Sequence, residues 1–108
     1  MSSPVAELIQ KQIAENPVIL YMKGTPDAPE CGFSAAAIAA LKTTGIEFAY
    51  VNVLKAPQIR ERLPSVSRWP TFPQLFVGGE LIGGSDIVVA MVKDGSLLPM
   101  LVAASTPA

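Results

Sequence analysis

The chain has 108 residues, half of them apolar, and a formal net charge of −1, which predicts one domain whose core needs no disulfide bonds. It contains no histidine, and this excludes Cys–His and Ser–His catalysis together with every histidine-ligated metal site. The scattered lysines and arginines argue against nucleic-acid binding, and no apolar run approaches the roughly 18–20 residues of a membrane span. We therefore expect a single domain over residues 1–108, with its core at about 5–102 and a frayed C-terminal tail.

One cysteine, Cys31, stands alone in the sequence. A lone cysteine without a secretory leader indicates a reducing compartment. The N-terminal stretch carries Glu7 and Glu15 but no arginine, so we expect neither a signal peptide nor a transit peptide. The cytoplasm is the expected location, with an organelle matrix after processing as the alternative.

The first half of the chain predicts alternating helices and strands. Residues 5–13 place apolar side chains on one helical face. The continuous apolar run 18–22 is typical of a strand covered on both faces, and a loop over 23–30 follows it. A helix then opens at Cys31, and its alanine-rich body at 35–42 favours helix strongly.

The second half predicts a further strand and helix, then a hairpin and two helices. Pro57 suits a first helical turn and Pro64 is expected to disturb that helix near its end. Gly78 and Gly79 predict a tight turn between two short strands. Ser85 or Asp86 would cap the next helix. The expected elements are the strands 48–53, 75–77 and 80–82 and the helices that start at 57, at about 87 and at 97.

This order predicts an α/β protein with a four-stranded mixed sheet. A strand–helix–strand unit gives two parallel strands joined by a right-handed crossover, and the hairpin adds two antiparallel strands. Helices on both faces of such a sheet are the arrangement of the thioredoxin fold.

Cys31 follows a strand and a loop and lies at a helix N-terminus. Unpaired backbone N–H groups and the helix dipole favour a thiolate there, and Lys23 can add positive charge. A thiolate attacks disulfides and binds metals. The alternative is a buried cysteine that acts as a small apolar core residue.

The stretch Cys31-Gly32-Phe33-Ser34 is a C-x-x-C redox motif with serine in place of the second cysteine. Three further blocks follow the same order and spacing as in monothiol glutaredoxins of the Cys-Gly-Phe-Ser type. These blocks are Tyr21-Met22-Lys23-Gly24, Trp69-Pro70-Thr71-Phe72-Pro73-Gln74 and Gly83-Gly84-Ser85-Asp86. The chain resembles that family from about residue 5 to 101.

The resemblance implies a glutathione site. Lys23 and Arg60 match basic residues that hold the glycine carboxylate of glutathione; otherwise they are solvated surface cations. Phe72 precedes the proline, Pro73, that is cis in this fold, and its backbone would pair with the cysteinyl part of glutathione. Pro73 can also be a plain strand breaker.

Ser85 and Asp86 match the pair that binds the γ-glutamyl end of glutathione at a helix N-terminus. Helix capping is the other interpretation of these two residues, and both can hold together. Many family members have cysteine where this chain has Ser85, so an internal disulfide is impossible here. Phe33 and Trp69 can be core or exposed, and an exposed Phe33 would favour a contact surface.

The resemblance further implies a [2Fe–2S] cluster that is held by Cys31 from each of two chains and by two glutathione molecules. The expected function is iron–sulfur cluster transfer or assembly by a homodimer, with apo iron–sulfur proteins and a BolA-like protein as possible partners. The second hypothesis is a glutathione-dependent thiol–disulfide oxidoreductase that uses Cys31 alone, with weak activity at most. A five-residue insertion, 26–30, resembles the cluster-carrying class. A third hypothesis, a protein-interaction module without a cluster, would require a buried and unreactive Cys31.

Overall fold

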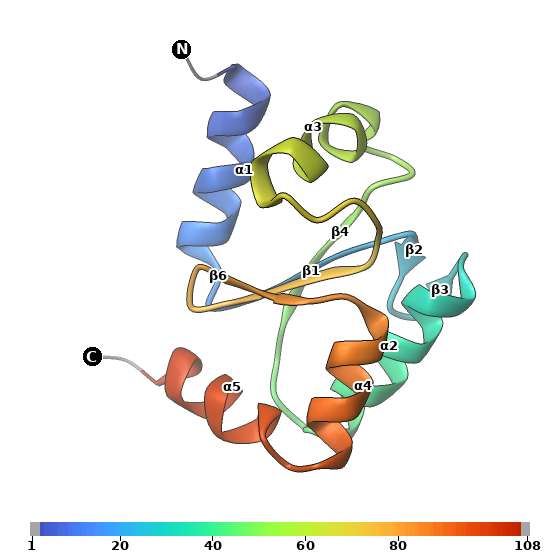
Figure 1. Ribbon diagram of the computed structural model, residues 1–108, viewed down its shortest axis with the longest axis vertical. Coiled ribbons are helices and arrows are strands. Elements are labelled where there is room, and N and C mark those ends of the chain that lie inside the picture. Colours follow the sequence, from blue (N-terminus) through green and yellow to red (C-terminus); the bar gives the residue numbers. More distant parts are fainter. Residues whose placement is uncertain (1–2, 107–108) are drawn as a thin grey trace.

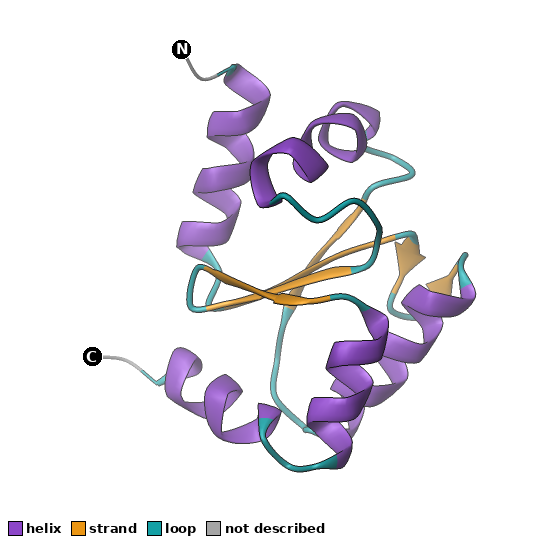
Figure 2. Ribbon diagram, viewed as in Figure 1, coloured by secondary structure: helices purple, strands orange, loops and turns teal. Residues whose placement is uncertain are grey.

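The computed structural model describes residues 3–106 of the chain (Figures 1 and 2). Its elements, in chain order, are α1 (Pro4–Glu15), β1 (Val18–Met22), β2 (Gly24–Thr25), β3 (Ala28–Pro29), α2 (Gly32–Thr43), β4 (Ala49–Asn52), α3 (Pro57–Ser67), β5 (Gln74–Val77), β6 (Glu80–Gly83), α4 (Ser85–Lys93) and α5 (Leu97–Ser105).

The main sheet has four strands in the order β4-β1-β5-β6. β1 runs parallel to β4 and antiparallel to β5, and β5 and β6 form an antiparallel hairpin. The mixed four-stranded sheet predicted from the sequence is therefore confirmed. The parallel pair needs the crossover that α2 supplies, and this connection brings the N-terminus of α2 to the end of β1.

Helices cover both faces of the sheet (Figure 1). Val18, Leu20 and Met22 of β1 pack in one apolar cluster with buried side chains of α2, α4 and α5. Ile19 and Tyr21, which point to the opposite face, pack in a second cluster with α1 and α3. All five residues are buried, as expected for an apolar strand that lies between two helical layers.

Pro64 lies inside α3 near its C-terminal end, and the helix continues past it to Ser67. Leu63 before it is fully buried, and Val66 after it packs against the same apolar cluster. This packing offsets the hydrogen bond that a proline removes from a helix. Arg68, the C-cap residue of α3, has a left-handed φ of 60°.

The C-terminal helix is longer than predicted. α5 continues to Ser105, and the Thr106 hydroxyl donates a 2.7 Å hydrogen bond to the Val102 carbonyl. Ser105 is thus the last residue of α5, and Thr106 is its C-cap residue. The last two residues of the expected frayed tail, 107–108, lie outside the described residues.

No single helix within residues 3–106 has the length and apolar composition needed to cross a bilayer. α4 and α5, which are bent by 97° relative to each other, pass the same test as a pair by length and composition alone.

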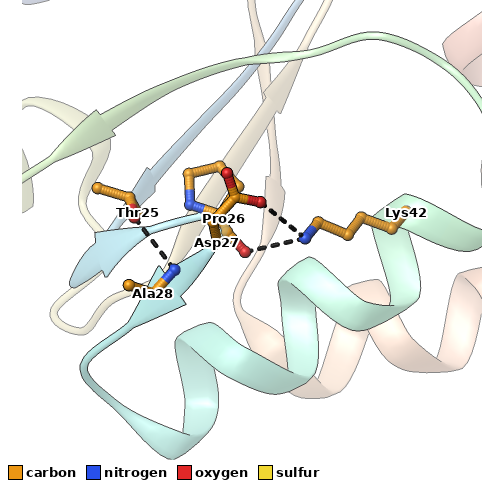
Figure 3. Close-up of polar contacts among 5 residues, drawn as sticks. All are labelled: Thr25, Pro26, Asp27, Ala28 and Lys42. Carbon is orange, nitrogen blue, oxygen red and sulfur yellow. Dashed lines mark hydrogen bonds and ion pairs between the residues drawn. The ribbon is translucent and has the colours of Figure 1, made fainter.

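The predicted loop over residues 23–30 contains a small hairpin made of β2 and β3. Thr25 Oγ1 accepts a 3.1 Å hydrogen bond from the Ala28 N–H. Lys42 of α2 donates a 3.0 Å hydrogen bond to the Pro26 carbonyl and lies 3.6 Å from a carboxylate oxygen of Asp27 (Figure 3). Because this ion pair is exposed, it contributes ~0–1 kcal/mol to stability. The contact nevertheless fastens the hairpin tip to α2.

Candidate functional site

One pocket of about 610 Å³ gathers the residues that the sequence proposed for ligand binding. They come from five segments that are far apart in the chain: the end of β1, the start of α2, α3, the loop before β5 and the start of α4. The six candidates that line the pocket are Lys23, Cys31, Arg60, Phe72, Ser85 and Asp86. The fold therefore brings all six to one place.

Cys31 occupies the N-cap position of α2 and is partly exposed at the pocket. Its side chain makes no capping hydrogen bond, but it lies beside backbone N–H groups of the first turn. The N–H of Ser34 makes the largest contribution to lowering the pKa of the Cys31 thiol. The N–H of Phe33, the positive charge of Lys23 and the Ser34 hydroxyl also lower this pKa, whereas burial raises it. A lowered pKa favours the thiolate form, and the alternative of a buried core cysteine is wrong, because Cys31 is partly exposed.

Ser34 links the cysteine to the end of β1. It is fully buried, and its hydroxyl oxygen accepts a 3.0 Å hydrogen bond from the backbone N–H of Lys23. In the sequence, Ser34 was noted only because it replaces the second cysteine of the C-x-x-C motif. The structure shows that it holds Lys23 against the first turn of α2.

We expect Ser34→Ala to raise the pKa of the Cys31 thiol, because the variant removes a hydroxyl that stabilises the thiolate. The rate of iodoacetamide alkylation against pH measures this pKa. In the wild type the midpoint should lie below that of an unperturbed thiol, and in Ser34→Ala it should move up. Ser65→Ala is the matched control, since the Ser65 hydroxyl bonds only the Arg62 carbonyl on the surface of α3. An unchanged or lower midpoint in Ser34→Ala would contradict the assignment.

Lys23 and Arg60 bring two positive charges to the pocket. Lys23 is partly buried and Arg60 is exposed. Neither forms an ion pair with any residue that the structure describes. Two unpaired cations at one pocket favour an anionic ligand, and Arg60 can bind a carboxylate through two N–H groups.

A hairpin separates Lys23 from Cys31 along the chain. The Glu30 N–H donates a 2.9 Å hydrogen bond to the Lys23 carbonyl. Asn52, at the end of β4, accepts from the Gly24 N–H at 2.9 Å. These contacts fix how far apart the lysine and the cysteine lie. The role of Asn52 was not predicted from the sequence, because its hydrogen-bond partner Gly24 is 28 residues away.

The loop between α3 and β5 forms one wall of the pocket. Trp69, Pro70, Thr71 and Phe72 all line it. The peptide bond between Phe72 and Pro73 is cis, and β5 begins at the next residue. Trp69 is partly buried in this wall, whereas Phe33, which also lines the pocket, is 65% exposed.

The start of α4 forms the remaining wall. The N-cap residue is Gly84, and neither Ser85 nor Asp86 makes a capping side-chain hydrogen bond, so the capping interpretation was wrong in this form. Ser85 is buried, whereas Asp86 is exposed in the first turn, where the helix dipole favours a negative charge. The side chains of both residues are therefore available to a ligand.

Cys31 also borders a second groove, of about 740 Å³, between α2 and α4. Phe33, Ser85 and Asp86 line both hollows. The thiol is thus approachable from the ligand pocket on one side and from the groove on the other.

The fold and the site define a class: a thioredoxin-fold protein with one activated cysteine at the N-terminus of α2, beside a pocket that suits an anionic ligand. The glutaredoxin family model matches residues 18–82, more than half of the chain. The chain belongs to the glutaredoxin family, and its single cysteine makes it a monothiol member.

Individual relatives agree with this assignment. The chain is 56% identical over 99 residues to glutaredoxin 4 of Escherichia coli K12, covering 92% of this chain and 86% of that protein. It is 59% identical over 83 residues to a probable monothiol glutaredoxin, GrlA, of Legionella pneumophila, covering 77% and 93%. Among solved structures, reduced apo GrxS14 of poplar has a TM-score of 0.76 and 41% identity and covers 91% of this chain and 90% of that chain.

Proposed function

We propose that the pocket binds glutathione. Lys23 and Arg60 bind its glycine carboxylate, and the backbone of Phe72 pairs with its cysteinyl part. Ser85 and Asp86 bind the carboxylate and the ammonium of its γ-glutamyl end. The support is the match between the charges of the ligand and those around the pocket: two unpaired cations on one side and a helix N-terminus with an exposed carboxylate on the other.

We propose further that the protein carries a [2Fe–2S] cluster as its cargo. Such a cluster takes four ligands, commonly thiolates, and the chain has one cysteine and no histidine. Cys31 from each of two chains and the thiols of two glutathione molecules complete the set. The donor chemistry fits, because the pKa of Cys31 is lowered and the thiol is exposed beside the proposed glutathione pocket.

The observation that carries this proposal is the position of Cys31: a thiol at a helix N-terminus, which borders both a pocket and an adjoining groove. The thiol is available to both a bound glutathione and a second chain. Because half of the ligands are exchangeable small molecules, the cluster can leave for an apo iron–sulfur protein. A BolA-like protein is a possible alternative partner for the second chain. The bacterial origin of relatives such as those of E. coli and L. pneumophila supports a cytoplasmic location.

The second candidate function is the reduction of protein–glutathione mixed disulfides. The Cys31 thiolate attacks the glutathionyl sulfur, the protein thiolate leaves, and Cys31 is joined to glutathione. A second glutathione thiolate then attacks this disulfide, which gives glutathione disulfide and frees Cys31. The lowered pKa of Cys31 favours this chemistry, but the hairpin of β2 and β3 resembles the insertion of the cluster-carrying class, so we rank this function second.

Anaerobic reconstitution with iron, sulfide and glutathione separates the two functions. The expected result is a coloured dimer by visible absorption and size-exclusion chromatography, which forms only when glutathione is present. A colourless monomer that turns over a glutathionylated substrate efficiently would overturn the carrier function in favour of the reductase.

A further inference from the structure

We propose that Gln74 is a positioning residue that aims the backbone N–H of Phe72 at the bound glutathione. The inference rests on the proposed glutathione site and adds a residue to it that does not itself line the pocket. Gln74 is the first residue of β5, and the other residues of that strand are apolar.

The Gln74 side-chain amide donates two hydrogen bonds to the loop that forms the pocket wall. It is fully buried, and its Nε2 donates to the Trp69 carbonyl at 2.8 Å and to the Thr71 carbonyl at 3.1 Å. Its Oε1 is buried without a partner. A buried unpaired oxygen costs about 1–3 kcal/mol, so an amide is an unfavourable way merely to fill this volume. What distinguishes Gln74 from an apolar residue here is its two donors.

The wall has few other internal restraints. Outside the helices and strands, no backbone-to-backbone hydrogen bond among the described residues involves residues 69–72. The Trp69 N–H donates to the Ser67 hydroxyl at 3.2 Å. On the far side Gly84 lies against the wall: a Cβ placed there would be 3.3 Å from the Pro73 carbonyl oxygen and from Trp69 Nε1. The loop is thus held between Gln74 and Gly84.

The direction of the Phe72 N–H follows from peptide geometry. The Thr71–Phe72 bond is trans, since the cis bond in this loop is the one after Phe72. In a planar trans peptide the C=O and N–H point in opposite directions. The Thr71 carbonyl points inward to Gln74, so the Phe72 N–H points away from Gln74. Phe72 lines the pocket, and this N–H is the donor that the proposed site offers to the cysteinyl backbone of glutathione.

Gln74→Met tests the role, because methionine has a similar volume but no donor. We expect the dissociation constant for reduced glutathione, measured by calorimetry, to rise roughly tenfold, the loss of about one hydrogen bond. The pH midpoint of Cys31 alkylation should not move, because the groups that set it belong to α2 and Lys23.

Tyr21→Phe is the matched control. Tyr21 is paired with Gln74 in the sheet and is equally buried, but its hydroxyl donates to Gln12 of α1 at 2.8 Å. The Tyr21→Phe variant should therefore be less stable than the wild type but should bind glutathione with a similar affinity. If Gln74→Met does not fold, Gln74→Glu keeps the side-chain volume, removes at least one donor and is measured in the same way.

Two results would overturn the inference: glutathione affinity that is equal in the wild type and Gln74→Met, or a Phe72 amide resonance that is the same in both. The second readout needs no ligand. A wild type that fails to bind glutathione would overturn the proposed function, while the Phe72 resonance would still decide the role of Gln74.

Discussion

Replacing Cys31 with serine should abolish cluster assembly. The variant should stay colourless and monomeric after anaerobic reconstitution, whereas the wild type should give a coloured dimer. The physical reason is that a serine hydroxyl does not ionise at neutral pH, whereas the lowered pKa of the Cys31 thiol favours the thiolate that binds metal, and the chain has no other cysteine or histidine to replace it. Visible absorption and iron content per chain measure the loss, which should be complete.

A double variant, Cys31→Ser with Ser34→Cys, separates the presence of a thiol from its position. It returns one thiol to the chain, about one helical turn further along α2. Ser34 is fully buried, whereas Cys31 is partly exposed at the pocket. The double variant should therefore be as colourless as Cys31→Ser. Restored colour and dimer formation would mean that any thiol in the first turn suffices, which contradicts the assigned role of Cys31.

The sequence alone predicted the main sheet and its helices well, for identifiable reasons. The run at residues 18–22 is apolar throughout because β1 is buried on both faces. The glycine pair at residues 78–79 marks the tight turn between β5 and β6, and both glycines have positive φ angles. Cys31 was placed correctly at a helix N-terminus because the alanine-rich segment after it is helical. These signals are local, so neighbouring residues are enough to detect them.

The details that the sequence did not predict depend on distant contacts or on burial. The hairpin of β2 and β3 exists because Asn52 and Lys42 reach it from β4 and α2. Pro64 is tolerated within α3 because the helix packs against α1 and the sheet. In the sequence, Gln74 lies just before the predicted strand at 75–77 and was given no role, and only its burial and its two carbonyl partners suggest the proposed one.

Gly24→Ala should destabilise the fold more than the addition of a methyl group at any other position of the site. Gly24 has a φ of 97°, and an added Cβ would lie 2.6 Å from both the Ala28 carbonyl oxygen and the Glu30 nitrogen. Both atoms belong to the backbone, so no side-chain rotation relieves the contact. The left-handed backbone costs an L-residue roughly 1–2 kcal/mol, and overpacking adds about 1–3 kcal/mol. Chemical denaturation measures the sum.

Gly79→Ala is the control that separates the destabilisation caused by the clash with the hairpin from the destabilisation caused by the left-handed backbone. Gly79 has a similar φ of 85°, but nothing lies within 4 Å of its added Cβ. It should show only the left-handed cost of roughly 1–2 kcal/mol, and the difference between the two variants measures the clash. Equal free energies of unfolding for the two variants would show that the hairpin moves aside without cost.

The same pair of variants tests whether the hairpin sets the geometry of the site. Gly24 lies between Lys23 and Cys31, and its N–H is held by Asn52. A shifted hairpin carries the Glu30 N–H away from the Lys23 carbonyl, so the lysine charge and the thiol no longer keep their spacing. Gly24→Ala should therefore raise the pKa of the Cys31 thiol as well as destabilise the fold, since the Lys23 charge contributes to lowering it. Gly79→Ala should leave the alkylation midpoint unchanged, because its turn lies at the other end of β5. An unchanged midpoint in Gly24→Ala, measured on folded protein, would show that α2 alone activates the cysteine and that the hairpin serves only stability.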